Sequence, residues 1–177
     1  MKKTLIYLFL AAGIMVSCQH QPTFTVKGSI ANAEGAILYL QHTALLQTTT
    51  GESCILNTTG TFHLEAPAPQ YPDFYRLRIG KNSLPLAIDS TETITIITTR
   101  DSLANTLSIE GSNNSLAIAH LRTTARYASR EELREAAKKV IITNPRSFSA
   151  YYAVFMKQSG EYIWNILMLQ TVACTKQ

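Results

Sequence analysis

The sequence predicts a mainly β protein, an antiparallel β-sandwich or open barrel followed by a short α-helical segment. Between residues 24 and 110, apolar and polar residues alternate with a period of two in short segments that are separated by turn-forming residues. Beyond Gly111 the apolar residues recur with the spacing of an amphipathic helix. A series of short strands with no helix between them is typical of a sandwich or a partly open barrel.

Turn-forming residues divide the β region into about eight strands. In chain order we expect them at residues 24–30, 36–42, 53–57, 61–65, 74–79, 84–88, 93–99 and 107–110. The short turn Asn32–Gly35 predicts that the first two strands pair as a hairpin, and the turn at residues 57–60 predicts a second hairpin. Three prolines between residues 67 and 72 remove backbone donors, so this stretch is expected to be a loop.

Three helices are expected after the β region. Ser115 can cap the first helix. Ser129 and Glu132 have the spacing of a capping box, which predicts that a second helix begins there. Pro145 ends that helix, and Ser147 caps a third that runs to about residue 158.

The N-terminus predicts an export signal. Two lysines precede an apolar run over residues 5–16, which is shorter than the ~20 residues needed to span a bilayer. Met15–Cys18 resembles a bacterial lipobox, in which the cysteine is lipidated and becomes the first residue of the mature chain. We therefore expect a lipid anchor at Cys18, on the inner or the outer membrane and facing the periplasm. The alternative is an ordinary cleaved signal with an incidental cysteine.

After cleavage of this signal, residues 1–17, we expect four parts in the rest of the chain. They are a tether at residues 18–23, the β domain at 24–112, the helical segment at 113–160 and an irregular tail at 161–177. We expect the β domain to fold by itself. The tail loses the helical period. This loss has two alternative explanations, a shifted reading frame or a natural short protein. If the frame is shifted, the tail was never selected to pack, and Cys174 belongs to that segment.

Charge and cysteine content exclude two classes of protein. Without Lys2 and Lys3 the 16 basic residues fall to 14, against 12 acidic residues, and this balance is too weak to favour nucleic-acid binding. With Cys18 acylated, only Cys54 and Cys174 could pair, and they lie in different contexts. A disulfide framework is therefore not predicted.

No pattern in the sequence predicts a catalytic residue, a cofactor or a metal. Cys54 lies within a strand, where a lone cysteine usually acts as a small hydrophobic residue. The four histidines lack metal-ligand spacing, although His42 and His63 on neighbouring strands could share a site. The sequence contains no nucleophile elbow, phosphate loop or paired carboxylates.

Basic residues recur every four positions in the helical segment. They are Arg122, Arg126, Arg130, Arg134 and Lys138. On one continuous helix they would form a basic ridge suited to anionic headgroups or an acidic partner. The capping box at Ser129 predicts a break in that helix, so we interpret these residues as part of a solvated face.

The strand pattern resembles a known family. The segments that carry the resemblance are Phe24–Ile30, Gly35–Leu40, Gly60–Leu64, Phe74–Leu77 and Ile109–Ser112. They resemble the N-terminal β-domain of Bacteroidetes lipoproteins known as domain of unknown function 4369. The resemblance covers residues 24–162 and includes the segment Thr143–Tyr152.

In longer members of this family, the resemblance implies that a thioredoxin-like domain of the ResA/TlpA type follows the helices. Its redox chemistry depends on a Trp-Cys-x-x-Cys motif, in which a helix N-terminus lowers the pKa of the first cysteine. Here Trp164 is followed by Asn-Ile-Leu, and Cys174 has no partner two residues further on. The chain thus resembles the accessory part of such a protein without its catalytic part.

These observations predict a lipid-anchored, non-catalytic accessory domain with a scaffold or partner-binding role in the cell envelope. Its expected partners are the membrane, through Cys18, and an envelope protein, with no nucleic acid. One alternative is a redox-active thiol protein that works through Cys54 or Cys174. Another is a glycan- or peptide-binding sandwich, suggested by the aromatic residues Tyr71, Phe74 and Tyr75.

Overall fold

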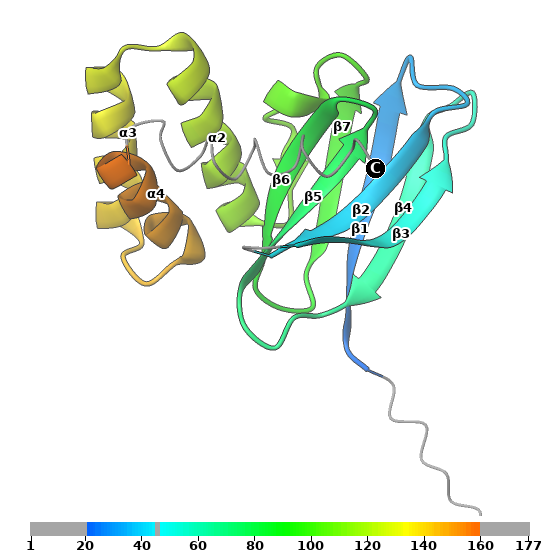
Figure 1. Cartoon of the computed structure of the whole chain (residues 1–177), viewed down its shortest axis with the longest axis horizontal. Coiled ribbons are helices and arrows are strands. Elements are labelled where there is room, and N and C mark those ends of the chain that lie inside the picture. The colour runs from blue at the N-terminus through cyan, green and yellow to red at the C-terminus, as the bar shows by residue number, and fades with distance from the viewer. Residues whose placement is uncertain (1–20, 45–46, 160–177) are drawn as a thin grey trace, which may run out of the picture.

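Two four-stranded sheets pack face to face, and three helices lie beside one of them (Figure 1). The computed structural model describes residues 21–44 and 47–159. The strands are β1 Thr23–Ala31, β2 Ile37–Thr43, β3 Thr48–Ile55, β4 Thr61–Pro67, β5 Asp73–Ile79, β6 Asn82–Ile88, β7 Thr93–Thr99 and β8 Ile109–Glu110. Sheet A has the order β4-β1-β7-β8 and sheet B the order β3-β2-β5-β6. The predicted mainly β sandwich with a helical segment is confirmed.

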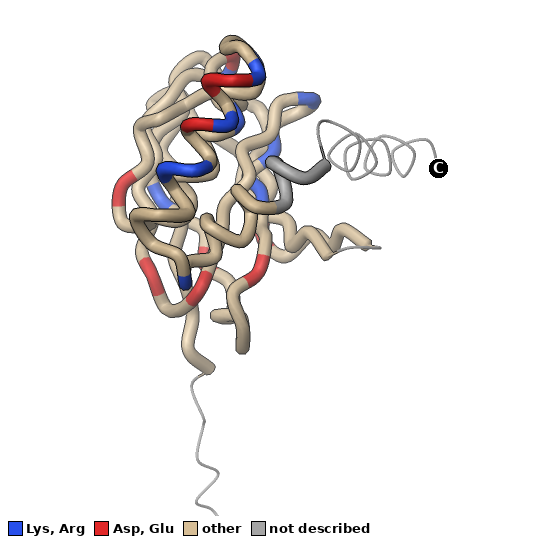
Figure 2. The backbone as a smooth tube through the Cα atoms, turned by 90° about the vertical axis from the view of Figure 1, so that its left-hand side faces the viewer, with Lys and Arg blue, Asp and Glu red and all other residues tan. Residues whose placement is uncertain are grey.

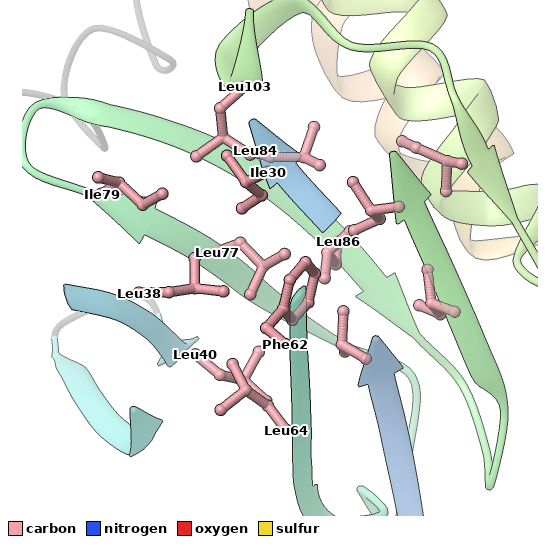
Figure 3. Packing of buried hydrophobic residues seen from close by; sticks show 14 of the residues in the cluster. Ile30, Leu38, Leu40, Phe62, Leu64, Leu77, Ile79, Leu84, Leu86 and Leu103 are labelled. Atoms are coloured by element: carbon pink, nitrogen blue, oxygen red, sulfur yellow. The ribbon is translucent and has the colours of Figure 1, made fainter. Parts of the chain in front are cut away.

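The core lies between the two sheets, where the apolar residues of the alternating pattern meet (Figure 3). Phe24 of β1 is fully buried, and its ring centroid lies 4.7 Å from that of Tyr75 in β5, on the opposite sheet. Leu40 and Leu77 face each other across the β2–β5 pair and are also buried. Burial of every second side chain, which is clearest in β1, β4 and β7, accounts for the period of two in the sequence.

The strand pairing differs from the prediction, because the first two strands do not form a hairpin. β1 pairs antiparallel with β4 and parallel with β7, whereas β2 pairs with β3 and β5 in the other sheet. The predicted second hairpin, between β3 and β4, is wrong for the same reason. Both short turns carry the chain from one sheet to the other. β3 also begins at Thr48, earlier than expected.

Two glycines allow the backbone to pass close to β1. Gly28 has a φ of 146°, and a Cβ atom there would lie 1.8 Å from the carbonyl oxygen of Ile96 in β7. Gly60 has a φ of 67°, and a Cβ atom would lie 2.1 Å from the carbonyl oxygen of Ile30. Only glycine fits these positions without displacing the backbone of β1 or β7.

The helices are α2 Asn113–Tyr127, α3 Arg130–Thr143 and α4 Phe148–Ser159, and a 3-10 turn η1 spans Leu103–Asn105. None of the helices in the described ranges has both the length and the apolar character needed to cross a membrane. Ser112, not Ser115 as predicted, is the N-cap of α2, and its side chain accepts a hydrogen bond from the Ser115 amide. Ser115 is instead turned toward the sheet.

The predicted capping box at the start of α3 is confirmed. The Ser129 hydroxyl accepts from the Glu132 amide, and the Glu132 carboxylate accepts from the Ser129 amide. Hydrogen bonds from the Ser129 backbone and side chain lower the pKa of Glu132. The Ser147 hydroxyl accepts from the Ala150 amide in the first turn of α4, as expected.

A second apolar cluster attaches the helices to the outer face of sheet B. Phe74 of β5 and Ala87 of β6 are paired in register and contribute the sheet side of this cluster. The buried helix residues of the cluster are Ile118, Leu121, Ala137, Tyr152 and Ala153. The helices thus cover the part of the outer face around Phe74, at the β6 edge of the sheet.

Candidate functional site

Cys54 has the surroundings of a structural cysteine. It lies in β3 opposite Leu38 and is partly buried against the core. Burial raises the pKa of the Cys54 thiol, which keeps it protonated and lowers its reactivity at neutral pH. Cys18 and Cys174 lie outside the described residues, so their predicted roles stay predictions.

His42 and His63 do not lie on neighbouring strands, because β2 belongs to sheet B and β4 to sheet A. His42 Nε2 lies 2.6 Å from the Asp73 carboxylate, and His63 Nε2 lies 2.9 Å from the Glu65 carboxylate. Each histidine therefore has its own acidic partner. Over residues 21–44 and 47–159 no group of three or more histidine, cysteine or acidic side chains could hold a metal ion.

The basic residues of the helical segment do not form one ridge. α2 ends at Tyr127 and α3 begins at Arg130, so the series is interrupted as predicted. Arg134 forms an ion pair with Glu131 at 3.2 Å, and Figure 2 shows basic and acidic residues interspersed along this part of the chain. A solvated, partly neutralised face is the better description of these helices.

The three aromatic residues near the proline-rich loop do not form a common platform. Phe74 packs against the helices, with ring centroids 4.5 Å from Phe148 and 5.8 Å from Tyr152. Tyr75 points to the opposite face of the strand, into the core, and Tyr71 is 73% exposed. This arrangement removes the basis of the predicted glycan or peptide platform.

A polar cluster that sequence reasoning missed lies on the outer face of sheet B, beside the part covered by the helices. We call it the arginine face, and it consists of Tyr39, Gln41, Arg76 and Arg78. In register, Tyr39 of β2 faces Arg78 of β5, and Gln41 faces Arg76. The four side chains share the outer face because Leu38, Leu40, Leu77 and Ile79, the residues that alternate with them, are buried in the core.

Gln41 holds both arginines through a single oxygen atom. Its Oε1 accepts hydrogen bonds from Arg76 Nε at 2.9 Å and from Arg78 Nε at 3.2 Å. Its Nε2 donates to the hydroxyl of Thr50 in β3 at 2.9 Å, which fixes the orientation of the carboxamide. Gln41 is only 6% exposed, so it supports the two guanidinium groups from below.

Arg78 is fixed by two further contacts. Its guanidinium carbon lies 4.7 Å from the centroid of the Tyr39 ring, within the range of a cation–π interaction. Its Nη1 donates to the carbonyl oxygen of Gly80 at 2.9 Å. The position of this charge is therefore set by contacts from both β2 and the end of β5.

Neither arginine has a carboxylate partner in the described part of the chain, since no acidic oxygen lies within 4.0 Å of either guanidinium group. Burial lowers the pKa of Arg76, and the positive charge of Arg78 lowers it further. A guanidinium group remains charged at neutral pH despite such a shift. The arginine face is thus a half-buried pair of like charges without a counter-charge of its own.

Comparison with known families places this site inside a defined domain. A family model described as "Domain of unknown function (DUF4369)" matches residues 24–116, more than half of the 177-residue chain. The chain belongs to the DUF4369 family. No curated protein matches it. The DUF4369 domain contains all four residues of the arginine face and extends to Leu116, just beyond Ser112 and Ser115.

Only a weak signal of the arginine face is present in the sequence of the DUF4369 domain. Arg76 and Arg78 occupy alternate positions of one strand, which is also the pattern of any solvated strand face. Their common acceptor, Gln41, precedes Arg76 by 35 residues and lies on another strand. The cluster becomes visible only when the register of β2 against β5 is known.

Proposed function

We propose that the chain is a lipid-anchored, non-catalytic binding module of the cell envelope, attached to a membrane through Cys18 and facing the periplasm. The lipobox at Cys18 supports the anchor, and β1 begins at Thr23, five residues further on. The chain belongs to the DUF4369 family, and the resemblance of its sequence to the N-terminal part of membrane-anchored thiol-disulfide oxidoreductases is part of this proposal. In this proposal the domain serves as a scaffold or partner-binding part in the envelope.

The arginine face is the observation that carries the binding role. Strands β2 and β5 are held on both sides within sheet B, so the side chains are presented from a rigid surface. Two adjacent guanidinium groups without a carboxylate partner lower the stability of the fold, so their presence indicates another purpose. Perturbed charges of this kind concentrate at functional sites. By contrast, the raised pKa of Cys54 disfavours thiol chemistry there.

Metabolic labelling with a fatty acid tests the anchor. We expect the wild-type chain and Cys54→Ser to incorporate the label to the same extent, and Cys18→Ser to incorporate none. A wild-type chain without label would refute the anchor.

An insulin-reduction assay tests the non-catalytic role. We expect no dithiol-dependent turnover from the full chain, because the Cys54 thiol is protonated at neutral pH. Turnover that disappears in Cys54→Ser or Cys174→Ser would favour the redox alternative.

A further inference from the structure

We propose that the arginine face binds a doubly charged phosphate group, of the kind carried by a phosphate monoester. This inference rests on the binding role proposed above and names the chemistry of the ligand. It follows from three features of the site: the convergence of two guanidinium groups, their unused donors and the missing counter-charge.

The two guanidinium groups converge because they share one acceptor. Arg76 Nε and Arg78 Nε both contact Gln41 Oε1, at 2.9 and 3.2 Å, so the two charges lie side by side. One compact anion can therefore contact both groups at once. Gln41 also holds the arginines in place before any ligand arrives, which reduces the entropy lost on binding.

Most N–H donors of the two guanidinium groups are unused in the described part of the chain. Within the described part of the chain, the Nη atoms of Arg76 make no hydrogen bond, and Arg78 uses only its Nη1, on Gly80. Guanidinium groups present paired N–H donors that match the oxygen atoms of phosphate and carboxylate. The arginine face can therefore offer several donors to an oxyanion.

Charge distinguishes phosphate from carboxylate at this site. The two arginines carry two positive charges, and no acidic side chain in the described residues offsets them. A carboxylate neutralises one of these charges, whereas a phosphate monoester carries close to two negative charges and three acceptor oxygens at neutral pH. The phosphate monoester is the better match in charge and in acceptor number.

The neighbouring strand leaves room for such a ligand. Arg76 is paired with Pro85 of β6 and Arg78 with Ser83, and both partners are small side chains that are partly exposed. The helices that cover sheet B pack on Phe74 and Ala87, the next pair in the same register. The helices therefore border the arginine face on one side, and Arg76 and Arg78 themselves are only half-buried.

Calorimetric titration of the full chain with methyl phosphate and with dimethyl phosphate tests the charge requirement. We expect methyl phosphate, the monoester, to bind at least about tenfold more tightly than the singly charged diester, because only the monoester offsets both guanidinium groups. Equal affinities would overturn the proposal, as would tighter binding of a glutamate-rich peptide, which would indicate a polypeptide ligand.

A matched pair of variants tests the location. Arg76→Met should weaken methyl phosphate binding at least about tenfold, since it keeps the aliphatic stem and removes one guanidinium group. Arg134→Met, which removes an exposed arginine of α3, should leave the affinity unchanged. Unchanged binding by Arg76→Met, or an equal loss in both variants, would contradict the assignment.

Vesicles distinguish a soluble phosphate ester from a lipid headgroup. If a lipid supplies the group, the full chain carrying Cys18→Ser should bind vesicles that contain phosphatidic acid, a monoester, more tightly than vesicles that contain phosphatidylglycerol, a diester. If the ligand is soluble, methyl phosphate binds and the two kinds of vesicle do not differ. The methyl phosphate titration does not depend on acylation, so a chain that binds it without taking up fatty acid refutes the anchor alone.

Discussion

The outer face of sheet B has two halves: one is covered by the helices, and the other carries the arginine face. In the helix-covered half, Phe74 and Ala87 lie under the apolar side chains of α2, α3 and α4. In the other half, Arg76 and Arg78 carry two like charges that no acidic group in the described residues offsets. The two halves lie on the same strands, and Phe74 and Arg76 are only two residues apart. The apolar packing of the first half stabilises the fold, whereas the charge pair of the second half is better explained by ligand binding.

The helix-covered half also closes the edge of the sheet. Ser115 Oγ accepts from the Ala87 amide at 3.0 Å and donates to the Ala87 carbonyl oxygen at 3.1 Å, so it takes the place of a further strand. Pro85 lies on the same edge strand and has no amide hydrogen to expose. Exposed strand edges favour aggregation, so these features protect β6. The Ser115 side chain therefore acts at the sheet edge, whereas the cap of α2 is supplied by Ser112.

Loss of the aromatic contact should have the largest effect. We expect Phe74→Ala to lower the free energy of unfolding by about 2–4 kcal/mol, slightly less than for a fully buried phenylalanine because Phe74 is partly exposed. Denaturant unfolding measures this loss, and Tyr71→Ala, at a position that is 73% exposed, is the control. A loss of less than about 1 kcal/mol would mean that the helices are not held by this face.

Removal of the Ser115 hydroxyl should have the next largest effect. We expect Ser115→Ala to lower the free energy of unfolding by about 1–3 kcal/mol, because the buried Ala87 amide loses its acceptor. The exposed Ser90 supplies the control, Ser90→Ala, which should change stability by less than about 0.5 kcal/mol. If the two variants are equally stable, the serine does not close the sheet edge.

Local features of the fold could be predicted from the sequence, whereas pairings between distant segments could not. The alternation of apolar and polar residues located most of the strands, although not the start of β3, and the Ser129–Glu132 spacing located the start of α3. The turn Asn32–Gly35 has the same residues whether it closes a hairpin or carries the chain between sheets, so the partners of β1 were wrong. The arginine face depends on β2–β5 register, which no local pattern specifies.

The smallest expected effect concerns the arginine face itself. Arg76→Met keeps the aliphatic stem and leaves Gln41 Oε1 bonded to Arg78, so no buried acceptor loses its last donor. It also removes one of two adjacent like charges. If the arginine pair is present for binding and not for stability, the variant should retain the fold fully.

Denaturant unfolding of Arg76→Met and of the wild type, both without ligand, tests most directly the claim that the arginine pair is present for binding and not for stability. We expect the variant to lie within about 0.5 kcal/mol of the wild type, or to be more stable. A loss of more than about 1 kcal/mol would show that the Arg76 guanidinium holds the fold together, and would contradict its assignment to a binding site.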